Sequence, residues 1–335
     1  MSFSFFSKLR SSKQQLALIR DDLKRVREEM AAQVGHFSPY VKAYMGEICQ
    51  TRGKMIRPGL ALITAAATGG VKDSHVRFAA LLELVHIATL VHDDVLDHAE
   101  IRRDRPTPNA LWGNELAVLL GDSLLSHAMM MGADLGDISF CKRLSRAVRD
   151  VCQGEIEQST RLFDLEMTKA DYFELIQKKT AALFAVAMGG AAYLSGLDGE
   201  LVASLDRMGS LLGVAYQVYD DVLDMVGSEG AAGKTLHTDA EKGKITLPVL
   251  FLLESEHEGV STEVRDALEH REEANYARLS HTKAFQEAVS RSVDEGLART
   301  EEAREALWLL PLSPARESLT EMTYRLDELM RECCC

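Results

Sequence analysis

The apolar residues of this chain recur at intervals of three and four positions, which is the spacing of amphipathic α-helices. Residues 81–91 are apolar on nearly every face, so the helix that they predict is buried in the centre of the protein. Residues 14–34 predict an amphipathic helix, and the polar chain after residue 254 predicts helices on the surface. We see no alternating pattern of strands and no glycine-rich dinucleotide turn. The pattern therefore predicts an all-α protein.

The distribution of proline supports long helices. The chain has seven prolines and none between Pro108 and Pro248, so nothing in this region would break a helix. Residues 181–197 carry no charge, but they are at the lower length limit for crossing a bilayer. They are rich in alanine and glycine, which favours a buried helix with close neighbours. Since no linker or low-complexity segment divides the chain, we expect one domain covering residues 1–335.

The string Asp-Asp-Val-Leu-Asp occurs twice, at residues 93–97 and at residues 220–224. On a helix the three aspartates of each string fall on one side. Carboxylates this close together repel each other and raise each other's pKa, and apolar surroundings increase the cost. Two copies indicate two facing helices that present the same groups to a shared cavity.

A bound cation would relieve this repulsion. Carboxylate oxygens select hard ions, and Mg²⁺ usually takes one or two carboxylates and completes its shell with water and phosphate oxygens. The two Asp strings therefore predict a polyphosphate held between metal ions. The alternative, in which each string is a solvated helix end, is less compatible with two copies inside apolar helices.

Basic residues stand close to both Asp strings, as a phosphate site requires. They are Lys54, Arg57, Arg102, Arg103, Lys179, Lys234, Lys242 and Lys244. Each of them taken alone is more typical of a charge on the surface. His86 precedes Asp93 by about two helical turns and is either a core residue or a donor to phosphate. Gln217 precedes Asp220 by about one turn and could donate a hydrogen bond to substrate or to metal-bound water.

Together, these motifs resemble those of the trans-isoprenyl diphosphate synthases, also called polyprenyl synthetases, over residues 53–248. The Asp strings are similar to the two Asp-rich motifs of that family, and residues 53–58 are similar to its isopentenyl diphosphate motif. Lys179-Thr180 and residues 233–248 match as well. Three positions depart from the usual pattern: Arg52 and Asp104 replace glycines, and Ala240 replaces a leucine. These changes affect loop geometry and remove no matched metal ligand.

The resemblance implies a bundle of long antiparallel helices around a central cavity, a homodimer, and about three Mg²⁺ ions per active site. The implied metal ligands are Asp93, Asp97 and Asp220, supported by Asp94, Asp221 and Asp224. The residues implied for catalysis are Asp93, Asp94, Asp97, Lys179, Asp220 and Asp221. Those implied for the allylic diphosphate are Arg102, Lys179, Thr180, Gln217, Lys234 and Lys244. Those implied for isopentenyl diphosphate are Lys54, Arg57, His86 and Arg103.

The residues before the first Asp string bear on product length. Bulky aromatic residues at this place accompany short products in the family that the chain resembles, and here the residues are Val85, Ala88 and Thr89. Small side chains imply a tunnel that continues, although they also suit close helix packing. The expected floor of the tunnel is Leu125, Met129, Met130 or Met131. We expect a product of about six to ten isoprene units, a precursor of a quinone side chain.

Three other functions share part of this pattern. A terpene cyclase would share the first Asp string but is not expected to keep Lys54, Arg57 and His86. A non-catalytic subunit of a heteromeric synthase is expected to lose aspartates, yet all six are present. A short-chain farnesyl or geranylgeranyl diphosphate synthase is the serious rival.

The net charge of −13 disfavours a nucleic-acid binder and a stable attraction to anionic lipid, which leaves transient membrane contact for product release. The first residues do not resemble a secretory signal. The scattered cysteines show no disulfide or metal pattern, so a cytoplasmic location is expected. The final Cys333-Cys334-Cys335 is either a prenylation signal or an exposed thiol tail.

Overall fold

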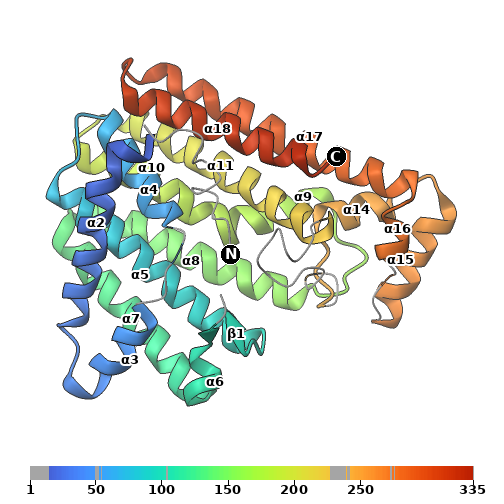
Figure 1. Ribbon diagram of the computed structural model, residues 1–335, viewed down its shortest axis with the longest axis horizontal. Helices are drawn as coiled ribbons and strands as arrows, with labels where there is room; N and C mark the ends of the chain where they lie inside the picture. Colours follow the sequence, from blue (N-terminus) through green and yellow to red (C-terminus); the bar gives the residue numbers. More distant parts are fainter. Residues whose placement is uncertain are drawn as a thin grey trace.

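The computed structural model describes residues 15–49, 53, 55–102, 105–226, 239, 242–271, 274 and 276–334. Long helices dominate it and lie side by side (Figure 1). The first half contains α2 (Gln15–Val34), α3 (Pro39–Cys49), α4 (Ile56–Ala67), α5 (Asp73–Leu96), β1 (Ile101–Arg102), β2 (Arg105–Pro106), α6 (Pro108–Trp112), α7 (Asn114–Leu135) and α8 (Ile138–Thr160). The prediction of an all-α fold is confirmed.

The second half begins with α9 (Lys169–Ile176), the π-helical turn η2 (Gln177–Ala181), α10 (Ala182–Ser195) and α11 (Gly199–Val226). It continues with α14 (Leu247–Leu253), α15 (Glu258–His270), α16 (Tyr276–Leu279), α17 (Lys283–Glu305), the 3₁₀ turn η3 (Ala306–Leu309) and α18 (Pro314–Glu332). The helices expected at residues 14–34, 181–197 and beyond 254 are therefore present.

The apolar helix predicted at residues 81–91 lies within α5, which packs against α2, α4, α7 and α10. Leu81, Leu82 and Val85 have no exposed surface. Since neighbours cover α5 on several sides, an apolar sequence all round is what its position requires. Both α5 and α7 are long and apolar enough to cross a membrane by length and composition, but α5 is mostly buried inside the protein.

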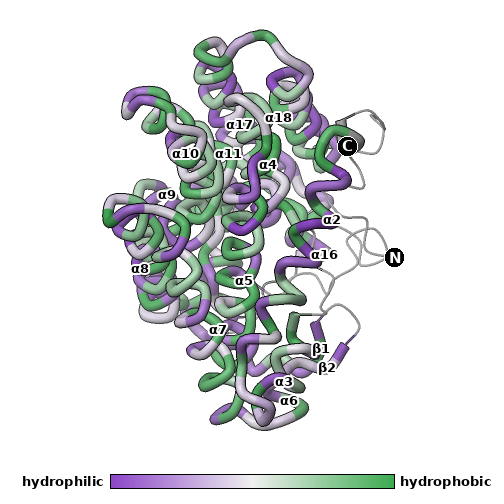
Figure 2. Tube along the Cα trace, turned by 90° about the vertical axis from the view of Figure 1, so that its left-hand side faces the viewer, coloured by the Kyte–Doolittle hydropathy of each residue, from purple (hydrophilic) through white to green (hydrophobic). Residues whose placement is uncertain are grey.

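The outer helices bury one face and expose the other. One buried apolar cluster extends from Ile19 of α2 to Met330 of α18. Figure 2 shows hydrophilic residues along α2 at the edge of the molecule and apolar segments in the interior. Helices α17 and α18 run together along one side and pack on α11 (Figure 1). The Asp strings are thus carried by helices that neighbours hold in place.

One short element was not expected from the sequence. Strands β1 and β2 form an antiparallel hairpin in which Arg102 pairs with Arg105. Each strand has only two residues, too few to produce an alternating pattern. The hairpin folds back just after α5 and so places Arg102 beside the first Asp string.

Candidate active site

The two Asp strings mark the ends of two long helices. Asp93 and Asp94 lie in the last turn of α5, and Asp97 caps that helix. The second string, residues 220–224, lies in the last turns of α11. Asp94, Asp221 and Asp224 are buried, whereas Asp93, Asp97 and Asp220 are half-buried. Each string therefore has members inside the protein and members toward the open side.

Lys244 connects the strings, and Lys242 adds a second contact to the first string. Lys242 Nζ lies 3.0 Å and Lys244 Nζ lies 3.9 Å from Asp97 Oδ2. Lys244 Nζ is also 3.1 Å from Asp239 Oδ1, and the backbone N–H of Asp239 donates to Asp224 Oδ2 at 3.4 Å. These contacts lead from the end of α5 to the end of α11, so the two strings face a shared site as the sequence predicts.

Asp93 is a carboxylate whose ionised form is disfavoured by its surroundings. Burial and the nearby carboxylate of Glu155 raise the pKa of Asp93 to about 7, although Lys179 and Arg102 oppose the shift. A divalent cation would stabilise the ionised form of this group. Asp93 therefore has the electrostatic surroundings expected of a metal ligand.

The other two aspartates of the first string have cationic partners. Burial raises the pKa of Asp94, and Arg102 opposes this by donating a hydrogen bond from Nε to Asp94 Oδ1 at 2.7 Å. Burial also acts on Asp97, but Lys244 and Lys242 outweigh it and lower its pKa. The cations near the string are thus already paired with carboxylates, and a diphosphate would exchange with those partners.

In the second string, Asp221 is held inside the protein. Its Oδ2 accepts a hydrogen bond from the hydroxyl of Tyr172, and its Oδ1 accepts one from Gln217 Nε2, both at 2.7 Å. Burial and the carboxylate of Asp239 raise the pKa of Asp221 to about 7, more than these two hydrogen bonds lower it. Since donors of the protein engage both oxygens, Asp221 is placed to orient its neighbours.

Helix α8 contributes two site residues that the sequence analysis missed. Lys179 Nζ donates to Glu155 Oε2 at 2.7 Å and to Gln158 Oε1 at 2.6 Å. In the sequence these two residues lie on an ordinary polar helix without a repeated string. Only their spacing of about one helical turn could have suggested a shared face.

Lys179 and Thr180 lie in the π-helical turn η2, whose wider spacing turns the two side chains to different partners. Lys179 reaches α8, whereas Thr180 Oγ1 donates to Gln217 Oε1 of α11 at 2.6 Å. Two glycines on neighbouring helices allow these helices to pack closely against the turn. A Cβ on Gly154 would stand 2.7 Å from the backbone nitrogen of Lys179, and one on Gly213 would stand 2.6 Å from Ala181 Cα. A π-turn inside a helix often marks a functional site.

The predicted isopentenyl diphosphate residues are only partly described. Lys54 and Arg103 lie outside the described residues, as does Lys234 of the allylic set. The Arg57 guanidinium lies 5.2 Å from the ring centre of Phe184. Burial lowers the pKa of Arg57, and its Nε has no hydrogen-bond partner in the part of the chain that the structure describes. His86 is half-buried on α5.

The three predicted chain-length residues have different surroundings. Val85 is 0% exposed and Ala88 is 1% exposed, so packed atoms surround both. Neither side chain borders open space, because neighbouring helices enclose α5 at this level. Their role in setting product length stays a prediction. Thr89 is half-buried and donates from Oγ1 to the backbone oxygen of His86 at 2.8 Å. Of the three, Thr89 alone is more than marginally exposed.

The residues on α7 that were predicted to form the tunnel floor differ in how far they are exposed. Met131 is 2% exposed and belongs to the core, whereas Met130 is 58% exposed and lies on the outer surface. Leu125 and Met129 are half-buried and pack against the core. The outward position of Met130 makes it unsuitable as a tunnel floor within one chain.

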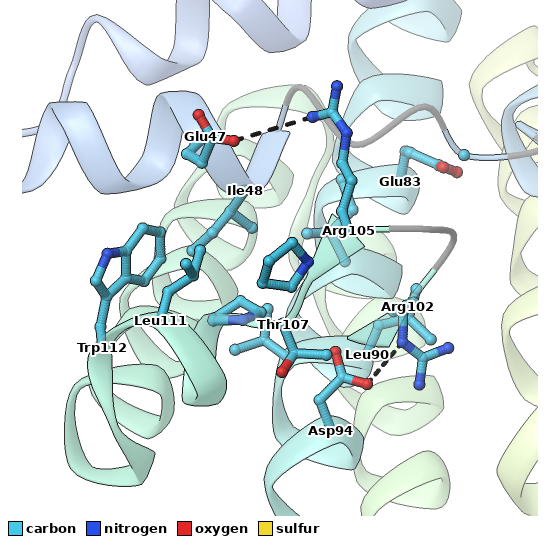
Figure 3. Close-up of a pocket in the computed structure, with 15 residues that line it drawn as sticks. Glu47, Ile48, Glu83, Leu90, Asp94, Arg102, Arg105, Thr107, Leu111 and Trp112 are labelled. Atoms are coloured by element: carbon cyan, nitrogen blue, oxygen red, sulfur yellow. Dashed lines mark hydrogen bonds and ion pairs between the residues drawn. The ribbon is translucent and has the colours of Figure 1, made fainter. Parts of the chain in front are cut away.

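A cavity of about 390 Å³ lies between α3, α5, α6 and the hairpin (Figure 3). Leu90, Leu111 and Trp112 form much of its apolar wall. Figure 3 shows the bonded Asp94 and Arg102 closing one side of it. The first Asp string thus stands between the charged site and an apolar space.

The donor set fits a hard divalent cation, because the groups at the ends of α5 and α11 are carboxylates. Among the described residues, no three His, Cys, Asp or Glu side chains are close enough to hold an ion alone. Fold and site therefore define an all-helical protein arranged for a metal-bound phosphate ligand.

The chain belongs to the polyprenyl synthetase family, whose model matches residues 38–285. It is 32% identical over 308 residues to octaprenyl diphosphate synthase of Haemophilus influenzae, covering 90% of this chain and 92% of that protein. It is 36% identical over 245 residues to chloroplastic solanesyl diphosphate synthase 2 of Arabidopsis thaliana. That match covers 71% of this chain but spans only 59% of the relative's length.

A solved structure agrees with the family match. The polyprenyl synthase of Caulobacter crescentus, complexed with calcium and isoprenyl diphosphate, has a TM-score of 0.85 to this chain at 29% identity. The similarity covers 93% of this chain and 96% of that one. The resemblance inferred from the motifs is therefore confirmed.

Proposed function

We propose that this protein is a prenyl transferase that condenses isopentenyl diphosphate with an allylic diphosphate, farnesyl or geranylgeranyl. The product is a long all-trans polyprenyl diphosphate of about six to ten isoprene units, as the relatives named octaprenyl and solanesyl diphosphate synthases suggest. The observation that carries the proposal is the contact chain from Asp97 through Lys244 and Asp239 to Asp224, which joins two Asp strings at one site. Relatives named octaprenyl and solanesyl diphosphate synthases support it.

Divalent metal use fits the carboxylates of the site and the calcium in the Caulobacter structure. In this proposal about three Mg²⁺ ions are held by Asp93, Asp97 and Asp220. When bound, they stabilise the negative charge that develops on the departing diphosphate. Asp94 and Asp221 orient the site, because Arg102, Tyr172 and Gln217 already hold them by hydrogen bonds.

The side chains of the chain then have distinct tasks. Lys179 and Lys244 release their carboxylate partners and neutralise the allylic diphosphate, with Thr180, Gln217 and Lys234 beside it. Arg102 keeps Asp94 through Nε and offers its other N–H groups to the same diphosphate. Lys54, Arg57, His86 and Arg103 hold isopentenyl diphosphate. The allylic carbon–oxygen bond breaks, the double bond of isopentenyl diphosphate attacks the allylic cation, and the diphosphate takes the proton. The apolar helices around the site exclude water, which would otherwise capture the cation.

The domain organisation, oligomeric state and location of the enzyme are also proposals. We infer one domain, because a single buried apolar cluster reaches from α2 to α18. We infer a homodimer, because the apolar helix α7 exposes Leu119 and Met130, at 63% and 58%. We infer a cytoplasmic location, because the cysteines show no disulfide pattern. Transient membrane contact would receive the product, which serves as a quinone side-chain precursor.

A short-chain synthase is the second candidate, and one observation favours it. Val85 and Ala88 are fully packed below Thr89, so a growing chain meets a closed wall along this face of α5. A long product would then require another path, such as the side toward the half-buried Leu125 and Met129.

Incorporation of labelled isopentenyl diphosphate into farnesyl diphosphate tests the function. We expect Mg²⁺-dependent incorporation that a chelator abolishes, and a loss of about 100-fold or more in Asp93→Asn, because the metal loses a ligand. Asp266→Asn, an exposed aspartate on α15, is the matched control and should match wild type. Undiminished incorporation by Asp93→Asn would contradict the proposal.

A further inference from the structure

We propose that Tyr172 is a positioning residue of the active site. Through its hydrogen bond to Asp221 it fixes the second Asp string relative to the π-turn that carries Lys179 and Thr180. This inference rests on the proposed function, since it assumes that a metal-bound diphosphate lies between these two elements.

The first step is the contact itself. The Tyr172 hydroxyl donates to Asp221 Oδ2 at 2.7 Å, and the two residues are only 2% and 4% exposed. Gln217 Nε2 occupies the other oxygen of Asp221 at 2.7 Å. A carboxylate held by two donors in a dry environment has a fixed orientation, because rotation would leave a buried oxygen unsatisfied.

The second step is that the contact is one of a pair. Thr180 Oγ1 donates to Gln217 Oε1 at 2.6 Å, so α11 is tied to the preceding segment at two places. One tie starts from Tyr172 in α9 and the other from Thr180 in η2. Lys179 lies between them in the chain and points the other way, to Glu155 and Gln158 of α8. The two ties therefore determine where the Lys179 backbone sits.

The third step is that a tyrosine suits this role. Its ring is packed in the core, with the ring of Phe173 edge-on at 5.3 Å, while its hydroxyl reaches a carboxylate of the site. A phenylalanine would keep the ring packing and remove only the hydroxyl. The variant Tyr172→Phe therefore separates positioning from packing.

We expect Tyr172→Phe to weaken binding of inorganic pyrophosphate in the presence of Mg²⁺ by about 10- to 100-fold, the usual effect of losing a group that orients metal ligands. KM for the allylic diphosphate should rise by a similar factor. KM for isopentenyl diphosphate should stay within about twofold, because Arg57 and His86 belong to α4 and α5, outside this link. A general loss of structure would not separate the two substrates.

Calorimetric titration of the metal-free protein with Mg²⁺ and inorganic pyrophosphate measures the binding directly. Tyr193→Phe is the matched control: the Tyr193 hydroxyl also donates to an aspartate, Asp137, at 2.7 Å, but at an exposed place. It should bind like wild type. In an Asp221→Asn background, adding Tyr172→Phe should cause little further loss, because the partner is already altered.

Equal binding by Tyr172→Phe and wild type would overturn the inference, and so would a full additional loss in the Asp221→Asn background. A wild-type protein that fails to bind pyrophosphate with Mg²⁺ would overturn the proposed function itself. The thermal unfolding midpoint of each variant shows whether it is folded at the titration temperature.

Discussion

The carboxylates of the site differ in their surroundings, and this has consequences for stability. Burial raises the pKa of Asp93 and of Asp221 from the ordinary value of 3.8 to about 7, with Glu155 and Asp239 adding to the effect. Between pH 3.8 and about pH 7 these two carboxyl groups bind protons in the folded protein but not in the unfolded chain. The free energy of unfolding of the metal-free protein therefore falls as pH rises through this window.

We predict that the unfolding midpoint of the metal-free protein decreases from about pH 5 to about pH 8, and that Asp93→Asn flattens this dependence. Thermal unfolding in a chelator, followed by circular dichroism, measures both. Mg²⁺ with pyrophosphate should restore stability at the upper pH, because binding favours the folded state. A variant with the same pH dependence as wild type would show that Asp93 does not titrate in this range.

The site residues that could be predicted from the sequence belong to recognisable motifs, and those that were missed do not. The aspartates form a repeated string, and the lysines stand in motifs of a family that the chain resembles, so both could be predicted. Glu155, Gln158 and Tyr172 carry no such string. Their role depends on where α8 and α9 pack against the π-turn, and that packing is not visible in local periodicity.

Among the elements, α5 was the most predictable. An apolar pattern on every face requires neighbours on every side, and the structure provides them. The same enclosure means that the small residues Val85 and Ala88 serve close packing in this structure, and the tunnel expected beside them stays a prediction. The hairpin and η2 could not be predicted, because two-residue strands and a five-residue π-turn leave no periodic signal.

Helix α7 presents a different case, because it is apolar yet only partly buried. Leu119 and Met130 are about three turns apart and lie on the same outer side. We predict that this side of α7 contacts the same side of a second copy, because the two subunits of a two-fold dimer meet through the same surface. Leu119→Asp should therefore shift the protein from dimer to monomer in sedimentation velocity.

The control for this shift is Leu312→Asp, because Leu312 is 85% exposed and lies between η3 and α18, away from α7. It should sediment like wild type. If Leu119→Asp remained dimeric, or if wild type were already a monomer, α7 would not be the interface.

At the scale of the whole molecule, one apolar core holds the long helices together and leaves the charged groups at the ends of α5 and α11. This explains why fold class and site chemistry were both predictable: the pattern that buries a helix also isolates the aspartates at its end. The terminal cysteines were less informative. Cys333 is half-buried against the core, Cys334 is exposed, and Cys335 lies outside the described residues.

Thr89 is the predicted chain-length residue that is half-buried and not enclosed. A phenylalanine at this position would block the open side of α5 next to the first Asp string. We predict that Thr89→Phe ends elongation earlier than wild type does. Ala88→Phe is a less suitable test, because Ala88 is enclosed and the larger side chain would strain the core.

The most direct measurement is the chain-length distribution of the products formed from farnesyl diphosphate and labelled isopentenyl diphosphate with Mg²⁺, read after dephosphorylation. We predict a ladder that ends at about six isoprene units or more for wild type and at fewer for Thr89→Phe. A wild-type ladder that stops at about three or four units would contradict the long-chain assignment and identify the packed wall at Val85 and Ala88 as the limit.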